Sequence, residues 1–74
     1  MNKLELIKQL KILNIPNSYY SFNGDKPDAY IFEDNKNHWK IYYVDERGNQ
    51  NDIREFTKES EACNYFLNEL KEEL

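Results

Sequence analysis

The feature that most constrains the fold is the run HWKIYYVDERG, from His38 to Gly48. Side chains alternate between two faces along an extended chain, so Trp39, Ile41 and Tyr43 point one way. The opposite face carries His38, Lys40, Tyr42 and Val44. Aromatic and β-branched residues suit a pleated, half-buried surface, and Gly48 can adopt the positive φ that a turn needs. The run therefore predicts a central β-strand that ends in a turn at residues 45–49.

Helical patterns lie on either side of this strand. Residues 2–13 carry an apolar stripe at helical spacing, and Asn2 and Glu5 stand in the positions of a capping box. Asn14 suits the left-handed residue after a helix, and Pro16 prevents continuation. After Phe56 we expect a second helix, capped by Thr57 and acidic in its first turn. Its expected buried stripe consists of Ala62, Cys63, Phe66, Leu67 and Leu70.

Three further segments predict strands: residues 28–34 and 50–56, and a possible edge strand at residues 18–22. A loop centred between Asn35 and Lys36 would set Phe32 opposite Trp39 and Glu33 opposite His38. One face would then gather Tyr30, Phe32, Trp39, Ile41 and Tyr43, and we expect both helices to pack on it. The predicted fold is a single two-layer α+β domain, residues 1–74. It has an N-terminal helix, a three- or four-stranded antiparallel meander sheet and a C-terminal helix.

Composition limits the setting of the protein. Its 74 residues suit one small core, its one cysteine cannot form an internal disulfide, and no apolar run is long enough to cross a membrane. Charges interrupt the first residues, unlike in a signal peptide. We therefore expect a cytoplasmic protein that does not associate with membranes; the sequence does not indicate its oligomeric state.

The net charge of −4 is unevenly distributed. Residues 1–14 hold three Lys and one Glu, a balance of +2, whereas the rest holds seven basic and thirteen acidic residues, a balance of −6. An acidic surface repels phosphate backbones and attracts basic partners. Charge alone is also explained by the need to keep a small aromatic-rich domain in solution. The balance favours a protein partner over a nucleic acid.

Few residues suggest catalysis. The single histidine, His38, is expected to oppose Glu33, as a general base oriented by a carboxylate would, but an exposed cross-strand pair looks the same. Cys63 belongs to the apolar stripe of the second helix. The carboxylates lack calcium-loop spacing, and two glycines do not make a phosphate-binding loop. We therefore predict no catalytic residue, no metal site and no cofactor.

The outward face of the sheet is the candidate interaction surface. Its apolar centre and charged rim have the composition of a protein-binding patch, with Tyr42 as the anchor. Alternatively, a helix or long side chains cover this face, and the patch does not exist. The predicted partner-binding residues are Lys40, Tyr42, Asp45, Glu46, Arg47, Asp52, Ile53 and Glu55.

The run HWKIYYVDERG, followed by FTKESEACNYFL, resembles small bacterial immunity proteins, which neutralise polymorphic toxins of the contact-dependent growth inhibition type. The resemblance covers roughly the C-terminal half. It rests on Trp39, Tyr42, Tyr43, Glu46, Arg47, Gly48, Phe56, Glu61, Ala62 and Phe66. It implies a cytoplasmic, non-catalytic inhibitor of one toxin domain, and many such toxins are nucleases with basic clefts. Two alternatives stay open. One is another small acidic inhibitor, such as a phage-encoded blocker of a nucleic-acid-processing defence complex; the other is a small hydrolase that uses His38 and Glu33.

Overall fold

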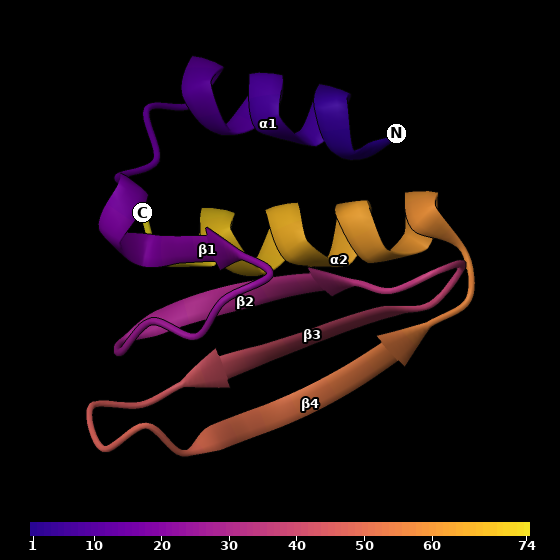
Figure 1. Cartoon of the computed structure of the whole chain (residues 1–74). Coiled ribbons are helices and arrows are strands. Elements are labelled where there is room, and N and C mark those ends of the chain that lie inside the picture. Colours follow the sequence, from indigo (N-terminus) through magenta and orange to yellow (C-terminus); the bar gives the residue numbers. More distant parts are fainter.

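The computed structural model covers residues 1–74 and places two helices on one side of a four-stranded sheet (Figure 1). Helix α1 spans Lys3–Ile12 and helix α2 spans Glu59–Glu72. The strands are β1 (Tyr20–Phe22), β2 (Ala29–Asp34), β3 (Trp39–Val44) and β4 (Gln50–Phe56), and a 3-10 turn, η1 (Asn17–Tyr19), precedes β1. The predicted α+β fold with a helix at each end is confirmed. Neither helix combines the length and the apolar character that a membrane span requires.

Local chemistry determines where the helices begin and end. Glu5 N donates to the Asn2 side chain at 2.9 Å and the Glu5 carboxylate accepts from Asn2 N at 3.4 Å, which confirms the capping box. Asn14 follows α1 with φ 55°, as expected. The predicted Thr57 cap is wrong, because extended Lys58 occupies the cap position of α2 and makes no side-chain cap bond. Glu59 lies in the acidic first turn, where the helix dipole favours it.

Phe66 lies at the centre of the core. All five residues of the predicted α2 stripe are buried, and α1 adds Leu6 and Leu10. The ring centroid of Phe66 is 5.3 Å from that of Phe32 on β2 and 5.8 Å from that of Phe22 on β1. Trp39 lies on the helix side, as expected, but it is only half-buried at the margin of the core. The ring of Phe66 therefore joins α2 to the aromatic side chains of β1 and β2, while α2 as a whole also packs on β3 and β4.

The predicted pairing of β2 with β3 is wrong by two residues. Lys36 and Asn37 both have positive φ and form a two-residue turn, closed where Asn35 N donates to His38 O at 2.8 Å. The turn centre is therefore one residue later than expected. Phe32 opposes Ile41, and Asp34 opposes Trp39. A shift of two residues preserves the side-chain alternation, so the predicted faces are correct although the partners are not.

The sheet is mixed, and not a purely antiparallel meander. β1 runs parallel to β2, with Tyr20 beside Tyr30 and Phe22 beside Phe32. Parallel neighbours usually need a crossover of a dozen or more residues, but β1 has only three residues, so residues 23–28 span the return distance. We call residues 23–28 the crossover connection. It folds back along β2 to the start of that strand (Figure 1).

The crossover connection covers the face of the sheet opposite the helices. Ala29, Ile31, Tyr42 and Val44 form a second buried cluster there, and Tyr42 is only 2% exposed. The Tyr42 hydroxyl lies 2.5 Å from the Asp25 carboxylate and 3.0 Å from that of Glu33. Burial, followed by these hydrogen bonds, raises the pKa of Tyr42, so the phenol stays protonated. The expected exposed apolar patch centred on Tyr42 is therefore wrong.

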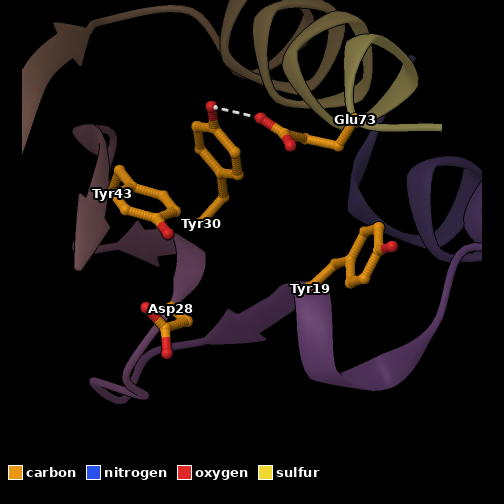
Figure 2. Close-up of a pocket in the computed structure, with 5 residues that line it drawn as sticks. All are labelled: Tyr19, Asp28, Tyr30, Tyr43 and Glu73. Atoms are coloured by element: carbon orange, nitrogen blue, oxygen red, sulfur yellow. Dashed lines mark hydrogen bonds between the residues drawn. The ribbon is translucent and has the colours of Figure 1, made fainter. Parts of the chain in front are cut away.

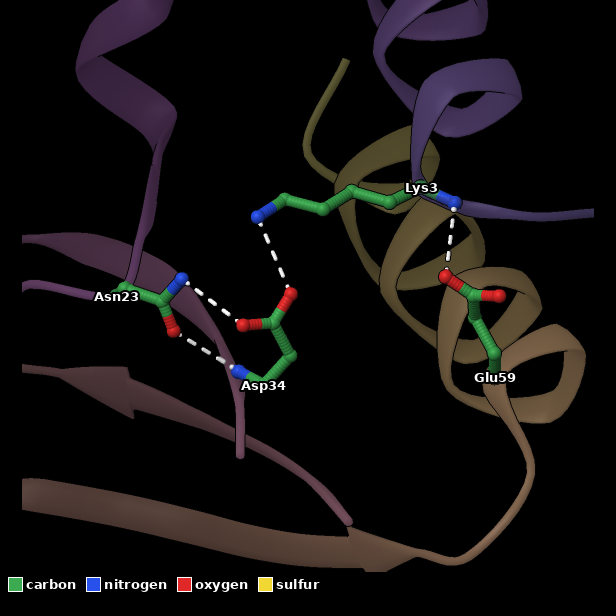
Figure 3. A network of polar contacts seen from close by, with 4 residues as sticks. All are labelled: Lys3, Asn23, Asp34 and Glu59. Atoms are coloured by element: carbon green, nitrogen blue, oxygen red, sulfur yellow. Dashed lines mark hydrogen bonds and ion pairs between the residues drawn. The ribbon is translucent and has the colours of Figure 1, made fainter. Parts of the chain in front are cut away.

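A polar network joins the other end of the crossover connection to both helices (Figure 3). Asn23 Nδ2 donates to Asp34 at 3.1 Å, and Asp34 N donates back to Asn23 Oδ1 at 2.9 Å. Lys3 Nζ donates to Asp34 at 3.2 Å, while Lys3 N donates to Glu59 at 3.3 Å. Burial acts to raise the pKa of Asp34, but the bonds from Asn23 and Lys3 and the charge of Lys3 outweigh it and lower the pKa.

Tyr42→Phe should loosen the crossover connection. The ring would keep its packing, but the hydroxyl contacts with Asp25 and Glu33 would be lost, at a cost of about 1 kcal/mol in unfolding free energy. Urea unfolding gives this cost, and amide hydrogen exchange should show faster exchange in residues 23–28. Tyr20→Phe is the matched control, because its hydroxyl bond to Asn17 is exposed and local. Equal effects of the two variants would contradict the anchoring role of Tyr42.

Asp34→Asn should lower stability at pH 7 and have little effect in acid. A lowered pKa in the folded state means stabilisation that is present above the ordinary value near 4 and lost as pH falls through the lowered pKa. The side chain is 35% exposed, so screening limits the contribution of its ion pair to roughly 0.2–1 kcal/mol. Urea unfolding of both proteins at pH 7 and pH 3 measures the difference. Asp52→Asn, at an exposed position, controls for net charge.

Candidate partner-binding site

A hollow opens at the end of the sheet where β2 begins, β3 ends and α2 terminates (Figure 2). Its volume is about 210 Å³. We call it the tyrosine pocket; it is lined by Tyr19, Asp28, Tyr30, Tyr43 and Glu73. Three of its walls are aromatic rings, and the other two side chains are carboxylates.

Strand pairing places the rings. Tyr30 and Tyr43 oppose each other across β2 and β3, with ring centroids 5.0 Å apart and planes inclined at 62°, an edge-to-face arrangement. Tyr30 Oη donates to the Glu73 carboxylate at 3.3 Å, which links the sheet to the end of α2 (Figure 2). Tyr19, from the turn before β1, stands across the hollow from Tyr43. The pocket thus combines three segments that are distant in sequence.

Carboxylates dominate the electrostatics of the pocket. Burial raises the pKa of Tyr30 to about 12, with the negative charges of Glu73 and Glu69 contributing. Burial also raises the pKa of Tyr43, and the charges of Asp28, Glu73, Asp45 and Glu46 act in the same direction. The carboxylates that act on one or both of these tyrosines form what we call the acidic end of the sheet: Asp28, Asp45, Glu46, Glu69 and Glu73. Burial disfavours any charge, but the part of each shift that comes from the carboxylates reflects a negative potential, which favours a cation at the same position.

The arrangement suits a cation in two respects. Tyrosine faces attract ammonium and guanidinium groups through the ring quadrupole. Carboxylates accept strong charge-assisted hydrogen bonds from the same groups. Both phenols are neutral at pH 7, as tyrosines ordinarily are, and their oxygens can accept hydrogen bonds from such a cation.

The predicted acids at the β3–β4 turn differ in their roles. Asp45 Oδ1 accepts from Arg47 N at 3.0 Å and from Asn49 N at 2.9 Å, and Gly48 has φ 84°. The hydrogen bond from Asn49 and the other turn bonds lower the pKa of Asp45. Asp45 is therefore a structural residue of the turn. Glu46 and Arg47 are exposed and border a shallow hollow against the crossover connection.

The other predicted residues do not join this turn in one patch. Tyr42 is buried, with Lys40 Nζ 5.3 Å from its ring centroid. Asp52, with φ 53°, forms a bulge in β4, next to Ile53, which is 48% exposed. The carboxylate of Glu55 is occupied by His38, the residue just before β3. The predicted set is therefore split between the turn and the outer side of β3 and β4.

His38 has a different partner from the one expected. Its Nε2 lies 2.8 Å from the Glu55 carboxylate, whereas Glu33 opposes Lys40. Both members of the pair are largely exposed. Cys63 is buried, and burial raises the pKa of its thiol to about 11. No group of three or more His, Cys, Asp or Glu side chains is arranged to hold a metal ion.

The tyrosine pocket was missed from the sequence for identifiable reasons. The sequence correctly assigns Tyr30 and Tyr43 to one face, but a loop centred between Asn35 and Lys36 would set Tyr30 opposite Ile41. With the loop centred on Lys36 and Asn37, the two tyrosines become direct neighbours. Tyr19 and Glu73 carry no such signal, because only the tertiary arrangement brings η1 and the end of α2 to the sheet.

No protein-family model, no curated protein and no solved structure matches this chain.

The assignment of Asp45 to the turn leads to a test. Asp45→Ala should lower the urea midpoint, because two backbone N–H groups would lose their acceptor. Glu46→Ala should leave the midpoint unchanged, because that side chain is exposed and makes no hydrogen bond within the chain. Since the pKa of Asp45 is lowered, its effect should also fade as pH drops below the ordinary value near 4. Similar midpoints for both variants would refute the structural role.

Proposed function

We propose that this chain is a bacterial immunity protein that acts in the cytoplasm. It binds one toxin domain and covers the active site or the target-binding surface of that domain, without catalysing a reaction. One observation carries the proposal: the tyrosine pocket lies within a concentration of carboxylates at one end of the sheet. Aromatic residues surrounded by charge are typical of protein interfaces. The resemblance of the C-terminal half to immunity proteins supports the same reading.

Charge complementarity favours a toxin with a basic surface. A nuclease holds its substrate in a cleft lined by Lys and Arg, and carboxylates can occupy such a cleft in place of phosphates. Asp28, Glu46 and Glu73 are exposed and suited to this role, whereas Asp45 is engaged in the turn. The partner is therefore a protein and not a nucleic acid, whose phosphates the acidic end would repel.

The proposed interface differs from the one predicted from the sequence. Tyr42 cannot be the anchor, because the crossover connection covers it. The tyrosine pocket offers aromatic surface at the acidic end instead. Of the predicted residues, Glu46 and Arg47 stay in the proposed interface, at its border. Lys40, Asp52, Ile53 and Glu55 lie along β3 and β4, away from the pocket lining.

Charge reversal on the acidic end should slow association with the toxin. A tagged copy in the native host captures the partner, and mass spectrometry identifies it. Glu46→Lys should then reduce the association rate by roughly threefold to tenfold at low salt, with a smaller effect at high salt. Glu61→Lys is the matched control, because Glu61 is exposed in the first turn of α2, far from its Glu73 end.

Two results would contradict the proposal. An association rate that does not depend on salt would remove its electrostatic basis. An equal effect of Glu61→Lys would move the interface to the outer side of α2. The position of the gene distinguishes the remaining alternative, a phage-encoded acidic inhibitor, because an immunity gene should lie directly downstream of a toxin gene.

A further inference from the structure

We infer that the tyrosine pocket receives an arginine side chain of the bound partner. The inference rests on the proposed function, since it identifies the group of the toxin that the acidic end recognises. The pocket has a volume of about 210 Å³ and two kinds of wall, aromatic rings and carboxylates. Neither kind alone specifies arginine, but the two together match a flat, charged side chain with several N–H donors.

The aromatic walls match the flat surface of a guanidinium. Tyr30 and Tyr43 meet edge to face with centroids 5.0 Å apart, so the two rings present differently oriented surfaces to the hollow. Tyr19 stands on the far side of it (Figure 2). A guanidinium stacks on an aromatic face and is more weakly hydrated than an ammonium, so its transfer from water into a half-buried pocket costs less.

The carboxylate walls match the fork of N–H donors. The Asp28 carboxylate makes no hydrogen bond within the chain and lines the pocket just before β2. Glu73 lines it from the end of α2, and its only bond there, from Tyr30 Oη, is long at 3.3 Å. A carboxylate accepts several hydrogen bonds, so both groups keep free acceptor sites. Figure 2 shows the two carboxylates on opposite sides of the hollow, so a guanidinium can form a forked bond to one of them while it meets the negative charge of the other. A lysine ammonium is a compact point charge and lacks this fork.

Helix α2 reinforces the preference for a cation. Its C-terminal end, at Glu72, lies next to the pocket-lining Glu73. The unpaired carbonyl groups of a helix end carry a partial negative charge. This charge adds to the fields of Glu69 and Glu73, which already raise the pKa of Tyr30. Charge, shape and hydrogen-bonding capacity therefore point to the same ligand group.

A titration of the isolated protein tests the pocket directly. N-acetyl-arginine amide is added while the ring signals of Tyr30 and Tyr43 are followed by NMR, and the citrulline analogue serves as its uncharged match. We expect saturable shifts with the arginine compound at millimolar concentrations and binding at least tenfold weaker with citrulline. Equal shifts with both compounds, or shifts that do not saturate, would overturn the inference.

Two variants and one control locate the binding. Tyr43→Leu removes an aromatic wall, and Asp28→Asn removes a charge without touching the core, so each should weaken arginine binding several-fold. Tyr65→Leu is the matched control, because Tyr65 is also half-buried but packs on Phe56 outside the pocket. Unchanged arginine binding in Asp28→Asn, or equal loss in Tyr65→Leu, would overturn the inference.

Kinetics with the captured toxin separate the inference from the proposed function. Tyr43→Leu should speed dissociation by on the order of tenfold, because a buried anchor acts on the lifetime of a complex. If Glu46→Lys slows association but Tyr43→Leu leaves dissociation unchanged, the proposed function stands and the arginine inference falls. If the arginine compound binds as expected but the host yields no toxin, the proposed function falls and the pocket remains a guanidinium site.

Discussion

The Tyr42 hydroxyl reaches two carboxylates, Asp25 and Glu33, on the face of the sheet that no helix covers. A phenol has one proton, so a single donor serves both contacts. The contact with Asp25 fixes the middle of the crossover connection over the buried cluster of Ala29, Ile31 and Val44. Without that cover, these apolar side chains would meet water. The course of the connection also lets β1 lie parallel to β2, which brings Phe22 onto the ring of Phe66.

The helices and the crossover connection leave little of the sheet surface free for a partner. The helices cover one face, and the crossover connection covers much of the other. β4 is exposed at the sheet edge, but the bulge at Asp52 and the charges of Arg54 and Glu55 make it a poor template for pairing with another strand. The end of the sheet at the tyrosine pocket remains, where three elements finish or begin without covering one another. We place the proposed interface at this end because both sheet faces are covered and the β4 edge is poorly suited to pairing.

Features that depend on local chemistry could be predicted from the sequence. The capping box at Asn2, the left-handed Asn14, the five-residue stripe of α2 and the two sheet faces depend on neighbours within a few positions. The direction of β1 could not be predicted, because Asn23-Gly24 suits a hairpin. Contacts between distant residues select the longer return: Asn23 bonds Phe32 and Asp34, and Asp25 bonds Tyr42. Asp34 also explains the register: it is held in β2 by Asn23 and Lys3, which leaves the turn to Lys36 and Asn37. The pocket could not be predicted, since Tyr19 and Glu73 meet it only through tertiary packing.

The carboxylates of the acidic end form no ion pair within the chain, although Asp45 holds the turn by hydrogen bonds. Glu69 and Glu73 lie near the negative end of the α2 dipole and beside Tyr30, and Asp28 and Glu46 add negative charge beside the neighbouring Tyr43. A cation bound in the pocket would interact favourably with these carboxylates and with the end of the helix. By linkage, a ligand that binds only the folded chain stabilises it in proportion to RT ln(1 + [L]/Kd). The carboxylates around the pocket therefore link partner binding to folding stability, and a mutation that removes one of them should reduce the stabilisation that a basic partner confers.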